Sequence, residues 1–285
     1  MPKSKWNLNT IYISERLQES LRPISRCAMT TVVAPMGYGK TTAVEWYLAE
    51  RAGAEAPYIV RISVYSGNLA IFWKSVQDAF ARAGFAFLRE YDCPTDGASG
   101  GLLIDDLCHA LTGEKSCYIF IDDFHLLTDK RAPGFLCALA GRLPPNVHLI
   151  LASRDLFLPA AELVRLGGKV YQIGTAQLRL NHTELAVYTN RCGTALSDEQ
   201  IDTLLYYSEG WFSAVYLNLR MFSEHGVLPD PNSDISSIFT AAMIDPLPEK
   251  QREFLAVMGL ADEFTVEMAQ FVMADAHAED LLAAL

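Results

Sequence analysis

The segment at positions 34–41 reads Ala34-Pro35-Met36-Gly37-Tyr38-Gly39-Lys40-Thr41. It fits the phosphate-binding loop pattern, with alanine in place of the first glycine. The β-branched run Thr30–Val33 before it predicts a short buried strand, and the amphipathic segment that Lys40 opens predicts a helix. Two glycines let the loop backbone fold around phosphate oxygens, and the first amides of the helix attract anions. This context indicates a nucleoside triphosphate site rather than an ordinary glycine turn.

Composition narrows the class of protein. The 285 residues are 51% hydrophobic, enough to bury the core of one large domain or two. No apolar run approaches the ~20 residues that span a bilayer, and the N-terminus lacks a secretory apolar block, so we expect a cytoplasmic protein without a membrane partner. A net charge of −11 argues against direct DNA binding by these residues. The six scattered cysteines contain no Cys-x-x-Cys pair and predict reduced, packed thiols.

Strand and helix patterns alternate through the first part of the chain. Four further apolar runs predict strands: Tyr58–Ile62, Cys117–Ile121, Val147–Ala152 and Val170–Ile173. A helix is expected over Leu69–Ala83, followed by a loop over about Tyr91–Gly101 and another helix. This order predicts an α/β fold with a doubly wound parallel sheet, in which the run Cys117–Ile121 forms a central strand.

The pattern becomes purely helical from about Thr183. Three predicted helices, separated by glycines, form a small helical subdomain: Thr183–Arg191, Ser197–Tyr207 and Trp211–Ser223. The stretch Gly226–Ser236, with two prolines and several Ser and Asp residues, is the best linker candidate. Three shorter helices follow over Glu249–Val257, Thr265–Val272 and Ala278–Leu285. The last of them reaches the final residue, so we expect a fragment of a longer protein.

A nucleotide site also needs groups for magnesium and for the attacking water. Lys40 is expected to reach the β- and γ-phosphates, Thr41 to give its hydroxyl to Mg²⁺, and Thr42 to bond the α-phosphate. Asp122 and Asp123 follow an apolar run that would bring them to the carboxyl end of a strand beside the phosphate-binding loop. We expect Asp122 to hold magnesium and Asp123 to orient water. The alternative is a solvated acidic turn.

Two further residues are candidates for the same site. Arg154 closes the apolar run that begins at Leu149, where an arginine can sense the γ-phosphate. A surface arginine that caps a loop is the alternative. His125 lies three residues after Asp122 and fits a hydrogen bond that orients the acidic turn better than it fits catalysis.

Together these motifs resemble the nucleotide-binding region of LuxR-family transcriptional activators of the maltose-regulator (MalT-like) type, which are signal transduction ATPases with numerous domains. The resemblance runs through nearly the whole chain. The residues that carry it are Ala-Pro-Met-Gly-Tyr-Gly-Lys-Thr-Thr at 34–42, Ile-Asp-Asp-Phe-His-Leu-Leu at 121–127, Leu-Ala-Ser-Arg at 151–154, Leu178–Tyr188 and Gly210-Trp211.

The resemblance implies a regulatory switch that uses ATP, ADP and Mg²⁺. Such a switch is ADP-bound at rest, self-associates in the ATP state, and is reset by slow hydrolysis. DNA would be bound only through a C-terminal helix-turn-helix that these residues do not include. The implied parts are a P-loop nucleotide-binding domain at 1–178, a helical subdomain at 179–228, a linker at 229–247 and the start of a winged-helix domain at 248–285. Arg16 and Leu17 resemble the segment that lies against adenine.

The chain departs from the family pattern at two places. The usual Leu-Asp after the second strand is replaced by Ser63-Val64-Tyr65-Ser66, which removes an acidic group. A Gly-x-Pro motif of better-known relatives is replaced by Glu209-Gly210-Trp211-Phe212, which has no proline. Trp211 is therefore either a nucleotide contact or a core residue.

Other functions remain open at this point. A P-loop ATPase motor or a small-molecule kinase would make turnover itself the function. A kinase is expected to show an arginine-rich lid over the phosphates, whereas residues 183–223 hold only Arg191 and Arg220. A nucleotide-locked scaffold that never hydrolyses is a third class, against which Asp123 argues.

Overall fold

A computed structural model describes most of the chain: residues 7–8, 10–193, 195–226, 228, 240, 244–245, 247–261, 264–275 and 277–283. It divides into two compact units. The sheet unit comprises Asn9–Tyr188 and Glu209–Phe212. The helical unit comprises Met1–Leu8, Thr189–Ser208 and Ser213–Leu285.

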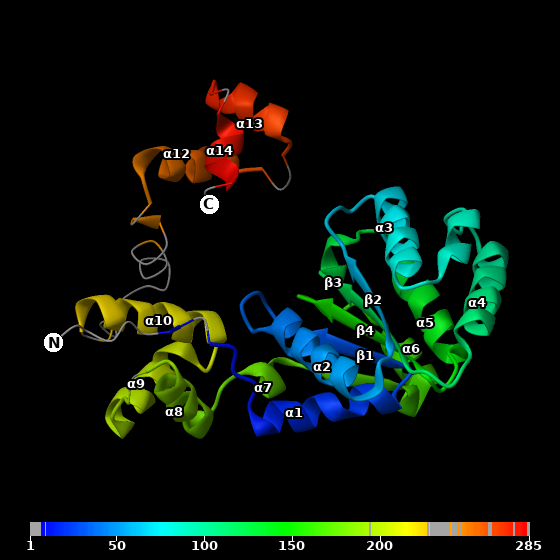
Figure 1. Cartoon of the computed structure of the whole chain (residues 1–285), viewed down its shortest axis with the longest axis horizontal. Helices are drawn as coiled ribbons and strands as arrows, with labels where there is room; N and C mark the ends of the chain where they lie inside the picture. Colours follow the sequence, from blue (N-terminus) through cyan, green and yellow to red (C-terminus); the bar gives the residue numbers. More distant parts are fainter. Residues whose placement is uncertain are drawn as a thin grey trace. The chain divides into compact units, whose positions relative to one another are not determined.

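The sheet unit is built on five parallel strands (Figure 1): β1 (Met29–Val33), β2 (Tyr58–Ser63), β3 (Cys117–Asp122), β4 (Val147–Ser153) and β5 (Val170–Ile173). Every residue of β3 and β4 is buried, as expected for interior strands of a parallel sheet that is covered on both faces. All five predicted strands are present within one residue of their predicted ends. The α/β fold with a doubly wound parallel sheet is confirmed.

The order of the strands is a feature that the sequence did not predict. The strand order is β2-β3-β4-β1-β5, so β3, which ends in Asp122, does not lie beside the strand that leads into the phosphate-binding loop. β4 pairs with both of them, with Leu149 opposite Met29 on one side and Ile119 on the other. Local sequence patterns do not encode which distant segments pair. The carboxyl ends of parallel strands still share one edge of the sheet.

Helices cover both faces of the sheet, because alternate strand residues point to opposite sides. On one face, α1 (Glu15–Leu21), α2 (Lys40–Glu55) and α7 (Thr175–Leu178) pack on Tyr118 and Phe120. On the other face, α3 (Leu69–Arg82), α4 (Gly97–Leu111), α5 (Ala132–Arg142) and α6 (Ala160–Leu166) pack on Ile119 and Ile121. Short 3₁₀ turns complete the unit at Arg22–Arg26, Ala86–Glu90, Phe124–Leu126 and Gly167–Lys169.

Helix α4 begins earlier than the sequence predicted. The predicted loop extended to about Gly101, whereas the helix starts at Gly97 after the N-cap Asp96. The Asp96 carboxylate accepts a hydrogen bond from the Ser99 backbone N–H at 2.8 Å, and the Ser99 side chain returns to the Asp96 backbone N–H. This capping box offsets the low helix propensity of the glycines in the first turns.

The described residues after Ile173 form helices and no strand. After α7 these helices are α8 (His182–Arg191), α9 (Asp198–Ser208), α10 (Phe212–His225), α12 (Glu249–Met258), α13 (Val266–Met273) and α14 (Ala278–Ala283). The last three form a small cluster around Phe254, Met258, Ala269 and Ala278. Most of the predicted linker Gly226–Ser236 lies outside the described residues.

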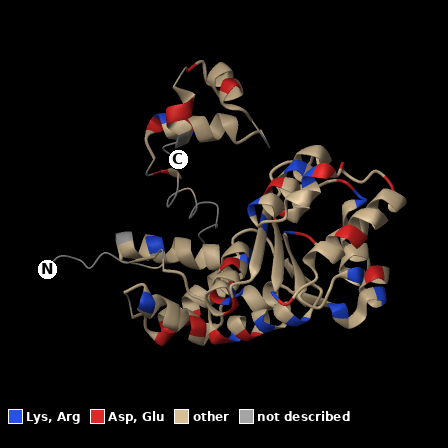
Figure 2. Cartoon of the chain, turned by 45° about the vertical axis from the view of Figure 1, so that its right-hand side comes forward, with Lys and Arg blue, Asp and Glu red and all other residues tan. Residues whose placement is uncertain are grey.

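Acidic and basic side chains are interspersed over the helices of the chain (Figure 2). The strands carry few of them, because most strand residues are buried between the helical layers. None of the described helices combines the length and the hydropathy that crossing a bilayer requires.

Candidate nucleotide-binding site

The loop Ala34–Gly39 connects β1 to the N-terminus of α2 at the carboxyl edge of the sheet. Gly37 and Gly39 have φ angles of 79° and 75°, a left-handed conformation that glycine adopts without strain. Gly39 is the N-cap of α2, and no side chain caps this helix end. A Cβ built on Gly39 meets no atom within 4 Å. The 16-residue helix thus has no side-chain cap at its N-terminus, and uncapped N-terminal amides attract an anion.

Lys40 is buried at the start of α2. Its Nζ donates hydrogen bonds to the carbonyl oxygens of Ala34 at 2.7 Å and Pro35 at 3.0 Å. An ammonium group has three donors, so one has no partner among the residues that the structure describes. Burial lowers the pKa of Lys40. The negative charge of Asp123 raises this pKa, and the positive charge of Arg154 lowers it further. A phosphate oxygen beside Nζ would compensate the buried charge.

Thr41 and Asp122 meet although they are 81 residues apart. The Thr41 hydroxyl donates to Asp122 Oδ2 at 2.8 Å, and the Asp123 backbone N–H donates to Asp122 Oδ1 at 2.9 Å. Burial raises the pKa of Asp122, and these two hydrogen bonds oppose the rise. A hydroxyl and a carboxylate are hard oxygen donors of the kind Mg²⁺ takes, alongside waters and substrate phosphates. The described residues hold no group of three or more His, Cys, Asp or Glu side chains placed for a metal ion.

Three more charged or polar residues converge on this edge. Asp123 has a φ of 52° and a side chain that is 47% exposed. His125 Nδ1 lies 3.9 Å from Asp123 Oδ1, and both ring nitrogens are buried without a hydrogen-bond partner in the described structure. Burial, and then the charge of Arg154, lower the pKa of His125, so the ring is neutral at pH 7. Arg154 directly follows β4 and is exposed, with no ion pair to any described residue.

Trp211 contacts the loop directly. Its indole Nε1 donates to the Met36 carbonyl oxygen at 2.9 Å, and its ring stacks on Tyr38 with centroids 6.2 Å apart. The turn before it is fixed, because Gly210 has a φ of 74° and its carbonyl accepts from the Leu180 N–H at 2.9 Å. A Cβ on Gly210 would lie 2.1 Å from the Leu180 oxygen, so only glycine fits. The sequence left the role of Trp211 open, and the structure places it against the loop backbone.

Arg16 and Leu17 lie on α1, and Arg16 bonds to residues outside the phosphate-binding loop. The Arg16 guanidinium donates to both Glu184 oxygens at 2.9 Å and to the carbonyl oxygens of Ala176, Gln177 and Arg179. None of these partners belongs to the phosphate-binding loop. Leu17 is buried in the layer that α2 forms on the sheet. Of the other loop residues, Ala34 is buried and Met36 is 63% exposed, whereas Thr42 is exposed on the first turn of α2.

No family model matches the chain. Curated proteins similar to it are MalT-type regulators. The HTH-type transcriptional regulator MalT of Vibrio campbellii is 22% identical over 297 residues, which cover 96% of this chain and 31% of that protein. MalT of Yersinia enterocolitica is 27% identical over 235 residues, 73% of this chain and 23% of that protein. The chain therefore spans less than a third of the length of these curated relatives. The resemblance to MalT-type regulators is confirmed.

Two solved structures share the fold. A Walker-type ATPase of Pyrococcus abyssi matches 99% of this chain and 91% of its own, with a TM-score of 0.52 and 12% identity. Cdc6p from Pyrobaculum aerophilum matches 100% of this chain and 88% of its own, with a TM-score of 0.50 and 13% identity. At these identities the likeness concerns the fold alone.

Proposed function

We propose that this chain is the ATP-binding switch module of a transcriptional regulator similar to MalT, with slow ATP hydrolysis. One observation carries the proposal: the hydrogen bond between Thr41 and Asp122 at 2.8 Å. It joins the end of the phosphate-binding loop to the end of β3, which is where a P-loop enzyme needs its magnesium ligands. The similarity in sequence to MalT-type regulators supports the regulatory context.

The residues of the site have distinct roles in this proposal. Lys40 and the first amides of α2, with Thr42, bind the phosphates, and residues 35–39 of the loop enclose them. Thr41 and Asp122 hold Mg²⁺, which supplies charge neutralisation at the phosphate oxygens. Asp123 orients the attacking water, and Arg154 senses the γ-phosphate. Arg16 and Leu17 belong to the segment that borders adenine.

The output of the module is a conformational state. The proposed parts are the nucleotide-binding domain at 1–178, the helical subdomain at 179–228, the linker at 229–247 and the first part of a winged helix at 248–285. ADP favours a resting state and ATP favours self-association, because each nucleotide stabilises the arrangement it binds better. DNA is then bound by a helix-turn-helix outside these residues, in the cytoplasm.

Removal of the Lys40 ammonium tests the nucleotide site. Lys40→Ala is expected to weaken ATP binding by about 100-fold or more in isothermal titration calorimetry, because a buried charge-assisted contact is lost. Lys74→Ala is the matched control, since Lys74 is 65% exposed on α3. It should bind ATP as the parent does. Submicromolar ATP affinity in a folded Lys40→Ala protein would contradict the proposal.

Slow hydrolysis and the resting nucleotide need separate measurements. Asp123→Asn should retain ATP binding and lower the multiple-turnover rate by about tenfold or more, because an amide is a poorer proton acceptor than a carboxylate. Asp106→Asn is the control, on an exposed part of α4. Chromatography of the nucleotide released from denatured, freshly purified protein identifies the resting state. Near-stoichiometric ADP supports a closed switch, whereas an empty site with brisk ATP turnover indicates a working ATPase.

A further inference from the structure

The sheet unit contains a large apolar cavity on the face opposite α2. It has a volume of about 430 Å³ and lies between α3, α4 and α5 over the strands β2, β3 and β4. Pockets that hold small ligands typically measure ~300–1,000 Å³. The space opens partly to solvent, and the apolar side chains that border it forgo packing contacts on that side. A cavity of this size is therefore a feature to be explained.

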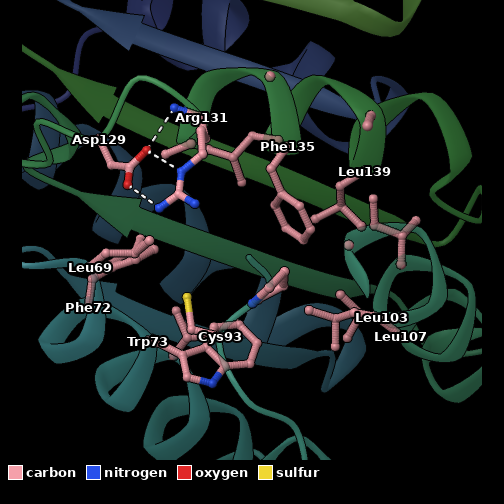
Figure 3. A pocket seen from close by; sticks show the side chains of 18 of the residues that line it. Leu69, Phe72, Trp73, Cys93, Leu103, Leu107, Asp129, Arg131, Phe135 and Leu139 are labelled. Atoms are coloured by element: carbon pink, nitrogen blue, oxygen red, sulfur yellow. Dashed lines mark hydrogen bonds and ion pairs between the residues drawn. The ribbon is translucent and has the colours of Figure 1, made fainter. Parts of the chain in front are cut away.

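The lining is almost entirely hydrophobic and aromatic. Figure 3 shows Phe72 and Trp73 on one side of the space and Phe135 on the other, with Leu103 and Leu107 at one end. The Trp73 indole N–H is already used, because it donates to the Tyr91 carbonyl oxygen at 3.0 Å. Such walls favour a molecule with an apolar, ring-containing body and offer little to a sugar or a phosphate.

Four charged residues line the cavity, and each already has a partner. Arg142 Nη1 donates to Asp105 Oδ1 at 2.8 Å, the Asp96 carboxylate caps α4, and Arg131 pairs with Asp129. Arg131 Nη2 donates to Asp129 Oδ2 at 2.7 Å, Arg131 Nε donates to Oδ1 at 3.0 Å, and Nη1 donates to the Thr95 carbonyl oxygen at 3.2 Å. The Arg131 hydrogen bonds lower the pKa of Asp129 to about 2, so this carboxylate stays ionised. A charged ligand would have to break this bidentate pair. The pairing therefore favours an uncharged ligand.

Glycines keep the space open. Gly97, Gly100 and Gly101 of α4 and Gly134 of α5 line the cavity, and none has a positive φ. A Cβ on Gly97, Gly101 or Gly134 meets no atom within 4 Å, and one on Gly100 meets only ordinary contacts at 3.5 Å or more. Alanine would thus fit at all four positions and would strengthen helices that each glycine weakens by ~1 kcal/mol. Neither backbone conformation nor packing requires these glycines, and the absence of their side chains leaves the wall of the cavity low at these positions.

We propose that this cavity binds a small, uncharged and predominantly apolar molecule with a ring system, at a site separate from the nucleotide site. The floor of the cavity includes Ile119 and Ile121 of β3, and Phe124 also lines it. A bound molecule thus contacts the residues on either side of Asp122 and Asp123. The proposal rests on the cavity alone and stands whether or not the chain binds ATP.

An uncharged fluorescent probe tests this site. N-phenyl-1-naphthylamine should bind the parent chain saturably with one molecule per chain, and its fluorescence should rise. Gly101→Leu places a side chain in the cavity from a helix position with free space, and should weaken probe binding about tenfold or more. Gly53→Leu is the matched control, because Gly53 is an exposed position of α2 that also has free space around its Cβ. It should bind the probe as the parent does.

A second variant protects the test against a folding defect. Ala138→Phe fills the cavity from α5 and should have the same effect as Gly101→Leu, with far-UV circular dichroism as the check on folding. Lys40→Ala should retain probe binding even where ATP binding is lost, which separates failure of this site from failure of the nucleotide site. Absence of saturable binding to the parent, or equal binding to the parent and both folded filling variants, would overturn the proposal.

Discussion

The two helical layers on the sheet differ in how completely they fill space. On the side of α1 and α2, Leu21, Val44 and Leu48 are all 0% exposed, and Arg16 ties α1 to Glu184. On the side of α3, α4 and α5, about 430 Å³ is left open. The same strands form the floor of both layers. The layer that carries the phosphate-binding loop is therefore the close-packed scaffold, and the opposite layer has room for a ligand.

Leucine truncation should show the largest difference between the layers. Leu48→Ala on α2 is expected to lower the free energy of unfolding by about 3–5 kcal/mol, because a fully enclosed side chain loses contacts on every side. Leu103→Ala on α4 should cost only about 2–3 kcal/mol, since Leu103 is 2% exposed but borders the cavity. Urea unfolding followed by circular dichroism at 222 nm measures both.

Exposed alanine substitutions provide the baseline for this pair. Leu102→Ala is suitable because Leu102 neighbours Leu103 on α4 and is 67% exposed. It should change the free energy of unfolding by less than about 0.5 kcal/mol. Equal losses in Leu48→Ala and Leu103→Ala would mean that the cavity layer is as tightly packed in solution as the α2 layer.

Strand positions could be predicted from the sequence because buried parallel strands are short apolar runs with clear ends. The run Val147–Ala152 is an example, since it lies wholly within β4. The order of the strands could not be predicted in the same way. That Leu149 pairs with both Met29 and Ile119 depends on segments far apart in the chain. The start of α4 was predicted too late, because its glycines are typical of a loop. The capping box of Asp96 and Ser99 starts the helix at Gly97, before Gly101.

Residues of the site could likewise be predicted only where a local sequence pattern marks them, and contacts between distant segments could not. The loop around Lys40 and the acidic pair at Asp122 follow local patterns, so they could be named as candidates from sequence alone. The contact between Trp211 and Met36 joins residues 175 positions apart, and no local signal indicates it. The sequence does not indicate the cavity either, because Gly97 and Gly101 are residues typical of a loop. Their meaning follows only from the helix that contains them.

Loss of the Arg16–Glu184 ion pair in the close-packed layer should lower the free energy of unfolding by an intermediate amount. Arg16→Ala leaves Glu184, which is 8% exposed, without its partner, and should cost about 2 kcal/mol at pH 7 because Arg16 itself is 40% exposed. Burial raises the pKa of Glu184, but hydrogen bonds from Arg16, Ser14 and Asn181 outweigh it and lower the pKa below its ordinary value of about 4.5. This stabilisation is therefore present above pH ~4.5 and is lost as the pH falls through the lowered pKa.

Unfolding measured at pH 7 and pH 3 tests that sign. The stability difference between the parent and Arg16→Ala should shrink at the lower pH, because protonation of Glu184 removes the charge that Arg16 stabilises. Arg22→Ala is the control, since its ion pair with Glu19 is exposed on both sides, and it should cost less than about 0.5 kcal/mol. An Arg16→Ala cost that does not change with pH would show that packing, and not the charge of Glu184, accounts for the loss.

The smallest expected effects come from one substitution at two glycines, and they have opposite signs. Gly39→Ala should destabilise the fold by about 1 kcal/mol, because φ at Gly39 is 75°. Gly101→Ala should stabilise it by about 0.5–1 kcal/mol, because the position is helical and its Cβ meets no atom within 4 Å. Thermal unfolding of the two variants beside the parent measures this difference. A stabilising Gly101→Ala would mean that helix propensity alone decides the effect at this position, whereas a destabilising one would mean that α4 needs its glycine for packing.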